Sequence, residues 1–98
     1  MIEITKTENY SKWYGKLRDF SAKAIINIRL RRIMLEQFGD VKNLKGGVFE
    51  IKIDHGPGYR IYYTQKGKEI ILLLLGGDKS DQERDIAKAR EILKELGE

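Results

Sequence analysis

Two neighbouring segments in which apolar and polar residues alternate strictly constrain this chain more than any other feature. Residues 48–54 alternate, and residues 59–64 repeat the pattern after the turn His55-Gly56-Pro57-Gly58. A period of two places successive side chains on opposite faces of a β-strand. The two segments are therefore predicted to pair as an antiparallel hairpin with one face buried.

A third strand is predicted at residues 70–75, which are apolar throughout. A strand without polar positions needs cover on both sides, so we expect both of its faces to be packed. Gly76 and Gly77 are expected to end it. This apolar run is also far shorter than the roughly 20 residues of a membrane-spanning helix, which argues against a membrane protein.

Apolar residues at helical spacing predict three helices. Thr7 is expected to cap the first helix, and Asp19 the second, which should extend from about Phe20 to Gln37. The segment Ser80-Asp81-Gln82-Glu83 has the form of a capping box and should begin the third helix. The second helix carries an additional apolar strip on a different side, which we interpret as packed against neighbours rather than kept free for a partner: Ala24, Ile28 and Leu35.

The order of these elements predicts the fold class. A short strand is expected at residues 2–5, and the glycine-containing residues 38–47 are expected to form a loop. The order is then strand, two helices, three strands and a helix, which predicts a two-layer α+β domain with an antiparallel meander packed against helices. A chain of 98 residues supports one such domain, residues 1–98.

Charge and composition narrow the classes of function. The chain has 19 Lys and Arg against 15 Asp and Glu, a net charge of +4, and because residues 81–98 carry −2, the rest carries +6. The positive charge of residues 1–80 is compatible with an anionic partner. The lack of cysteine excludes disulfides and thiolate metal sites, and no metal or cofactor is expected. No secretion signal is recognisable, so a cytoplasmic protein is expected.

The predicted hairpin gathers cations on the face turned away from the core. Its polar residues are expected to share an open face of the sheet: Glu50, Lys52, Arg60 and Tyr62. Pairing across the turn should bring Lys52 close to Arg60, and Lys79 can reach the same face from the end of the next strand. Arginine offers a planar fork of donors and lysine a mobile charge, so the group fits a phosphate. A solvated strand face is the alternative.

Other residues give weaker signals. The imidazole of His55 could transfer protons near neutral pH, although a turn residue that merely meets water is the alternative. Arg29, Arg31 and Arg32 could follow a nucleic-acid backbone, but they are scattered around their helix and do not form one stripe.

Two stretches resemble one protein family closely. They are FGDVKNLKGGVFEIKIDHGPGYRIYY at residues 38–63 and LLLLGGDKSDQERDIAKA at residues 72–89. Both resemble the RelE/ParE superfamily of toxin–antitoxin toxins, in particular the HigB-like group, known as addiction module killer proteins, and the resemblance spans nearly the whole chain. It implies a RelE-like fold and a small basic endoribonuclease that cuts translated mRNA in the ribosomal A site. The ParE branch instead inhibits DNA gyrase.

The resemblance also implies roles for individual cations. Arg60 matches the arginine that contacts the scissile phosphate, and Lys52 matches an active-site lysine. Lys79 stands where RelE-type toxins have an arginine. Lys45 corresponds to another basic position, and we expect Lys42 and Tyr62 to contact RNA together with it: these three form the predicted RNA-binding set.

Two departures from the RelE pattern leave the proton-transfer groups open. A second strand lysine of the family is Glu50 here, and the tyrosine of the last helix is replaced at about Asp85. Arginine cannot act as a base at neutral pH, so the candidates are Glu50, His55 or a lysine.

We therefore expect the toxin of a type II toxin–antitoxin system. Its activity should be ribosome-dependent mRNA cleavage, and its partners the ribosome, mRNA and a cognate antitoxin, in this group usually a helix-turn-helix protein. The alternatives are a non-enzymatic, ParE-like inhibitor of gyrase or another protein, and a simple nucleic-acid-binding module.

Overall fold

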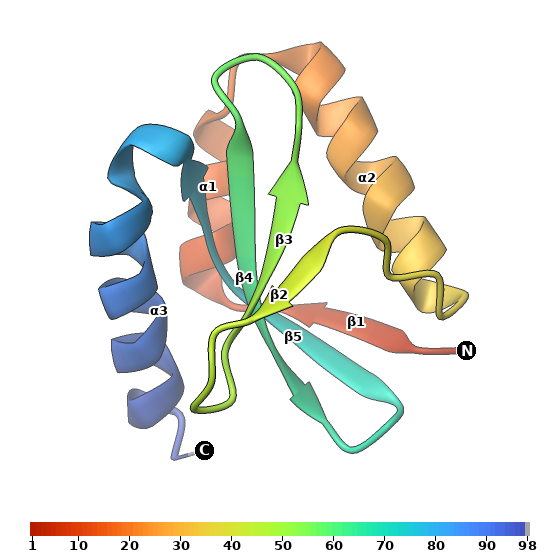
Figure 1. Cartoon of the computed structure of the whole chain (residues 1–98), viewed down its shortest axis with the longest axis vertical. Coiled ribbons are helices and arrows are strands. Elements are labelled where there is room, and N and C mark those ends of the chain that lie inside the picture. The colour runs from red at the N-terminus through yellow and green to blue at the C-terminus, as the bar shows by residue number, and fades with distance from the viewer. Residues whose placement is uncertain (98) are drawn as a thin grey trace.

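Five strands form one mixed sheet in the order β1-β5-β4-β3-β2, in a computed structural model that describes residues 1–97. The strands are β1 (Glu3–Lys6), β2 (Val41–Asn43), β3 (Phe49–Ile53), β4 (Tyr59–Lys66) and β5 (Ile70–Asp78). The helices are α1 (Glu8–Lys16), α2 (Phe20–Met34) and α3 (Gln82–Glu95), and a 3-10 turn, η1 (Lys79–Asp81), precedes α3. β1 runs parallel to β5, and all other neighbours are antiparallel (Figure 1). The predicted α+β class and the three-stranded meander are confirmed.

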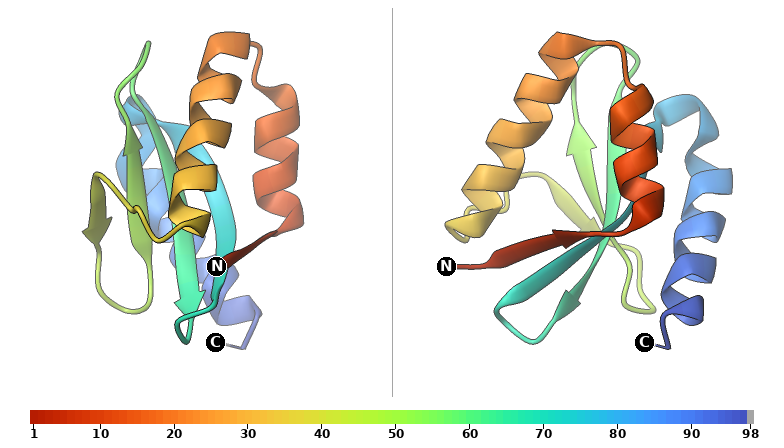
Figure 2. Two further views of the ribbon diagram at one scale, coloured as in Figure 1. Left: turned by 90° about the vertical axis from the view of Figure 1, so that its right-hand side faces the viewer. Right: turned by 180° about the vertical axis from the view of Figure 1, so that it is seen from behind.

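Helices cover both faces of the sheet. α1 and α2 lie together on one side (Figure 2). The residues of the sheet buried against them include Ile51, Ile53, Ile61, Tyr63 and Leu73. On the opposite face, α3 packs on a second cluster that contains Val48, Tyr62, Leu74, Ala89, Ile92 and Leu93. The apolar side of the hairpin therefore faces α1 and α2 as predicted, and β5 is packed on both faces.

Side-chain caps begin two of the three helices. Thr7 Oγ1 accepts a hydrogen bond from the Tyr10 N–H at 3.0 Å, and Asp19 Oδ1 accepts one from the Ala22 N–H at 3.0 Å, so both predicted caps are confirmed. The predicted capping box before α3 is wrong. Asp81 makes no side-chain cap bond, and the N–H of Ser80 donates to Asp78 Oδ1 at 2.9 Å within η1.

Residues 38–47 contain a strand that the sequence analysis did not predict. Val41–Asn43 form β2, which pairs with β3 so that Val41 lies opposite Ile51 and Asn43 opposite Phe49. A strand of three residues is too short to show the alternation by which strands are predicted, and its pairing with β3 is seen only in the structure.

Gly76 and Gly77 continue β5 instead of ending it, which corrects the sequence prediction. A β-carbon at Gly76 would overlap the indole ring of Trp13 in α1, and one at Gly77 would overlap the carboxylate of Asp85 in α3. Glycine is required at this point because side chains from both faces of the sheet lie directly on the strand backbone.

The second apolar strip of α2 is exposed, so its predicted packing against neighbours is wrong. All three of its residues are exposed: Ala24, Ile28 at 51% and Leu35 at 55%. Only the other side of the helix, which includes Ile26 and Ile33, reaches the core. None of the helices in residues 1–97 has the length and apolar character needed to span a membrane.

Candidate functional site

Three cations converge at the end of the β3–β4 hairpin. Lys52 and Arg60 are directly opposite each other in the β3–β4 register. Gly58, in the left-handed region at φ +82°, accepts a hydrogen bond at its carbonyl from the Lys79 N–H at 2.7 Å. This contact joins η1 to the hairpin turn, so Lys79 lies beside the same face, as the sequence predicted.

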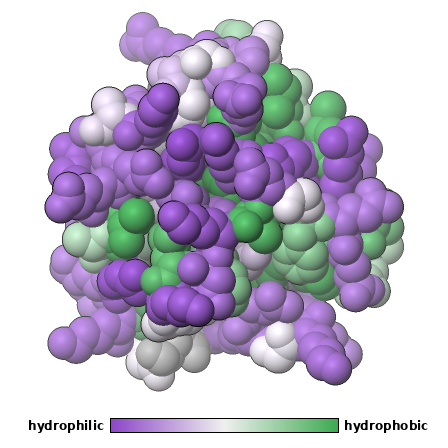
Figure 3. All heavy atoms as spheres, in the orientation of Figure 1, coloured by the Kyte–Doolittle hydropathy of each residue, from purple (hydrophilic) through white to green (hydrophobic). Residues whose placement is uncertain are grey.

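Two adjoining cavities meet at Lys52 and Arg60. The β2 cavity, of about 300 Å³, is lined by Asp40, Lys42, Glu50, Lys52, Arg60 and Gln82. The turn cavity, of about 260 Å³, is lined by Lys52, Asp54, Gly56, Pro57, Gly58, Arg60 and Lys79. Lys52 and Arg60 are the residues common to both, and the surrounding surface is largely hydrophilic (Figure 3). A group that bridges the cavities would thus contact both cations.

A larger depression, of about 500 Å³, lies elsewhere, over η1 and the start of α3. Its one cation, Arg84, pairs with Asp81 at 3.2 Å. We place the candidate site at the β2 and turn cavities because three cations line each of them.

Arg60 is a buried cation with incomplete pairing. The residue is 8% exposed, and its Nη1 donates to the neighbouring carbonyl of Tyr59 at 3.2 Å. Its Nε lies 3.9 Å from Glu50 Oε1, too far for a hydrogen bond, and this Nε has no hydrogen-bond partner among residues 1–97. Because a buried charge is costly unless it is well paired, this guanidinium favours an anionic ligand.

Glu50 is held by a residue that the sequence analysis did not identify as part of the site. Gln82, in the first turn of α3, donates from Nε2 to Glu50 Oε2 at 2.7 Å. Lys42 lies opposite Glu50 in the β2–β3 register and lines the same cavity. The sequence pattern marks Gln82 only as a residue at the start of a helix, and no local pattern predicts its contact with β3.

Tyr62 does not lie on an open face, and that prediction is wrong. Its side chain is fully buried beneath α3, in the cluster with Leu74 and Leu93. Burial, and after it the nearby Glu50 carboxylate, raises the pKa of Tyr62 above its usual value. The phenol is therefore protonated, and it cannot contact RNA from the protein surface.

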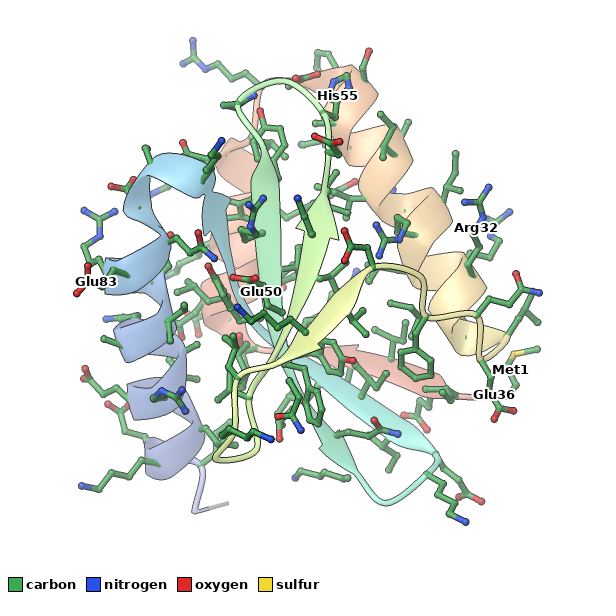
Figure 4. The ribbon with its side chains drawn as sticks, in the orientation of Figure 1. Met1, Arg32, Glu36, Glu50, His55 and Glu83 are labelled. Atoms are coloured by element: carbon green, nitrogen blue, oxygen red, sulfur yellow. The ribbon has the colours of Figure 1, made fainter. Side chains whose placement is uncertain are left out.

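Two other predicted site residues lie away from the cations. His55 Nε2 is 3.4 Å from Asp19 Oδ2, at the N-terminus of α2, and His55 lines neither cavity. Figure 4 shows His55 at the hairpin turn, well apart from Glu50 in the middle of the sheet. Lys45 lies in the β2–β3 loop, where its carbonyl accepts a hydrogen bond from Arg90 Nη1 at 2.9 Å. The structure thus brings together Lys42, Glu50, Lys52, Arg60 and Lys79.

The converging cations offer electrostatic stabilisation of an anion. Within residues 1–97, no group of three or more His, Asp and Glu side chains is placed to hold a metal ion. The cations surround a space that a phosphate could enter, and carboxylates also line it: Asp40 and Glu50 in the β2 cavity and Asp54 in the turn cavity.

Comparison with known proteins places the chain in a family. Residues 12–95 match the family described as phage derived protein Gp49-like (DUF891). This protein belongs to the Gp49-like family. A Haemophilus influenzae relative, described as an uncharacterized protein, is 43% identical over 96 residues, which cover 98% of this chain and 97% of the relative. The Gp49-like assignment therefore spans nearly the whole protein.

A solved structure confirms the RelE-like fold of this Gp49-like protein. The free-state structure of a mutant of the E. coli toxin RelE has a TM-score of 0.74 and 15% sequence identity. The match covers 92% of this chain and 95% of the RelE chain. At this identity the similarity establishes the fold, and the chemistry has to be argued from the site.

Proposed function

We propose that this protein is the toxin of a type II toxin–antitoxin system and that it cuts mRNA on the ribosome. The RelE-like fold supports a toxin of this kind. The observation that carries the nuclease proposal is the buried guanidinium of Arg60, which opens onto both cavities beside Lys52 and lies 3.9 Å from its nearest paired carboxylate. A phosphodiester would supply the missing negative charge.

In the proposed reaction, a ribose 2′-oxygen gives up its proton and attacks the adjacent phosphorus, and the bond from phosphorus to the leaving 5′-oxygen breaks. The 5′-oxygen takes up a proton from water, so the products are a 2′,3′-cyclic phosphate and a 5′-hydroxyl end. Negative charge builds on the nonbridging oxygens as the new bond forms. Fixed donors from Lys52, Arg60 and Lys79 would stabilise that charge more than the ground state.

Glu50 is our candidate for the group that accepts the 2′-OH proton. It lines the β2 cavity next to Arg60, whereas His55 lines neither cavity and pairs with Asp19. Gln82 donates to Glu50 Oε2, so the proton would go to Oε1, the oxygen that lies 3.9 Å from Arg60 Nε.

The proposed partners follow from the lining of the β2 cavity and from the resemblance to the HigB-like group. Lys42, at the edge of the β2 cavity, would contact RNA next to the cleaved phosphate. We assign the protein to the HigB-like branch on the two sequence stretches quoted above, and its partner would then be a cognate antitoxin of the helix-turn-helix type. Such a toxin acts in the cytoplasm, where ribosomes translate.

Purified protein added to a translating extract tests the proposal. We expect mRNA cuts within codons at the ribosomal A site, and we expect Lys52→Ala to cut far more slowly. The affinity for ribosomes should fall steeply with salt, because neutralised phosphates release counterions. Intact mRNA together with inhibited supercoiling by gyrase would contradict the proposal and favour the ParE-like alternative.

A further inference from the structure

Arg29 turns inward from α2, while Arg31 and Arg32 of the same helix are exposed. Its Nη1 donates to the carbonyl of Lys52 at 2.7 Å. Its Nη2 donates to the carbonyls of Phe38 at 3.3 Å and Asp40 at 3.2 Å. One side chain therefore joins α2, the end of β3 and the segment that leads into β2.

These contacts occur where the sheet edge loses its neighbouring strand. β2 pairs with β3 only as far as Ile51, which lies opposite Val41. The next residue, Lys52, has its N–H bonded to the Asp40 carbonyl at 3.2 Å and its carbonyl bonded to Arg29 Nη1. Arg29 thus binds the carbonyl that a longer β2 would have paired. Without Arg29, water could bond this carbonyl, but the main chain of Lys52 would lose its link to α2 and would be held on this side only through its N–H.

We infer that Arg29 is a positioning residue for the phosphate site, which fixes the main chain of Lys52 and through it the Lys52 ammonium between the two cavities. The inference rests on the proposed function. Arg29 lines neither cavity, so it acts through Lys52 and does not touch the substrate itself. The same side chain holds Asp40, which forms a wall of the β2 cavity.

The geometry explains why arginine is needed here. A guanidinium offers five donors in a rigid plane, so it can bind three carbonyls on two segments at once, whereas a lysine offers one mobile point charge. The approach is close: a β-carbon at Gly39, which has φ +68°, would lie 3.4 Å from Arg29 Nη2. This role also differs from contact with a nucleic-acid backbone, the use that the sequence suggested for Arg29.

A double-mutant cycle tests the inference. Single-turnover cleavage of ribosome-bound mRNA and binding of an uncleavable 2′-O-methyl RNA trinucleotide are measured in parallel. Arg29→Ala is expected to slow cleavage about 10²-fold, the typical effect of a small misplacement of a catalytic group. In a Lys52→Ala background the same change should have almost no further effect. The backbone of Lys79 is held by Gly58. The losses caused by Arg29→Ala and by Lys79→Ala should therefore multiply when the two substitutions are combined.

Two further variants keep the test decisive. Arg29→Lys, which retains the charge, replaces Arg29→Ala if thermal melting shows the latter to be unfolded, and it should follow the same pattern with a smaller loss. Arg18→Ala removes an exposed arginine just before α2 and should leave cleavage unchanged. Added methylguanidinium should restore part of the rate of Arg29→Ala and none of the rate of Lys52→Ala.

Losses that multiply in the Lys52→Ala background would overturn the inference, since general damage to the fold acts in every background. The proposed function fails separately. If the wild-type protein neither cuts mRNA nor binds the trinucleotide, the nuclease proposal is wrong and the inference falls with it. If it does both and the Arg29–Lys52 cycle shows no coupling, only the role of Arg29 is rejected.

Discussion

The Glu50 carboxylate of β3 and the Arg60 guanidinium of β4 lie side by side, with 3.9 Å between Glu50 Oε1 and Arg60 Nε. Both residues are buried, yet they attract each other without a hydrogen bond. Each therefore stabilises the other in the folded protein and still has capacity for a ligand. A substitution at either residue should therefore change both the free energy of unfolding and the rate of the proposed cleavage. Other variants are needed to separate these two effects.

Lys52→Ala is the variant that reports on chemistry alone. Lys52 is exposed, so the free energy of unfolding should change by no more than about 0.5 kcal/mol. Cleavage should fall by about 10² to 10³, the effect of losing one well-placed donor. Single-turnover cleavage and thermal melting measure the two quantities. Lys68→Ala, which removes an exposed lysine of the β4–β5 turn, is the matched control and should cleave normally.

Arg60→Ala should destabilise the fold as well as abolish cleavage. Strand alternation predicts Arg60 on an open face, where truncation would be harmless, but the residue is buried beside Glu50. Removal of one partner from a buried pair costs about 3 to 5 kcal/mol. Glu50→Gln in the same chain should recover part of the loss in urea denaturation. Equal stability of Arg60→Ala and the wild type would contradict the pairing.

Glu50 and His55 should differ in their effect on cleavage. Glu50→Gln keeps the shape and the contact with Gln82 but removes the proposed base, so the rate should fall by about 10² to 10⁴. His55→Ala should leave the rate within about threefold of wild type, because His55 lies outside both cavities. Single-turnover rates at neutral pH decide between the two residues, and a collapse in His55→Ala alone would reverse the assignment.

Two glycine-to-alanine changes should have opposite signs. Gly76→Ala forces a β-carbon into the Trp13 ring, and overpacking of this kind costs about 1 to 3 kcal/mol or more. Gly15→Ala, in helix α1, meets nothing within 4 Å and should stabilise the protein by about 0.5 to 1 kcal/mol, because alanine favours the helix. Chemical denaturation of both variants tests the packing of α1 on β5.

Asp85 should make stability depend on pH. Burial raises the pKa of Asp85 above its ordinary 3.8, with Arg84 opposing the shift. The folded state therefore binds more protons than the unfolded state just above pH 3.8, and the contribution of Asp85 to stability is lost as pH rises through the raised pKa. Asp85→Asn removes this loss, so its stability relative to wild type should grow from acid to neutral pH. Parallel urea titrations measure the difference, and a constant difference would contradict the shifted pKa.

Much of the candidate site could be predicted from the sequence, because strand alternation and a short turn determine the register. Lys52 and Arg60 face each other for this reason, and the turn at Gly58 brings Lys79 close. The partners of Glu50 could not be predicted. Gln82 comes from the start of α3, 32 residues away in sequence, and no local pattern encodes that contact.

The sequence by itself determined the local periods of the chain, and with them the helices, the hairpin, the N-caps at Thr7 and Asp19, and the α+β class. Only the tertiary structure decided which faces are covered. α3 buries Tyr62 on the supposedly open face, Trp13 and Asp85 enclose the two glycines of β5, and Arg29 turns inward to the edge of β3. The physical reason is that the period of a helix or strand sets which side of the element a residue occupies. Whether that side is buried depends on segments that are distant in the chain and that pack against it only once the whole sheet has formed.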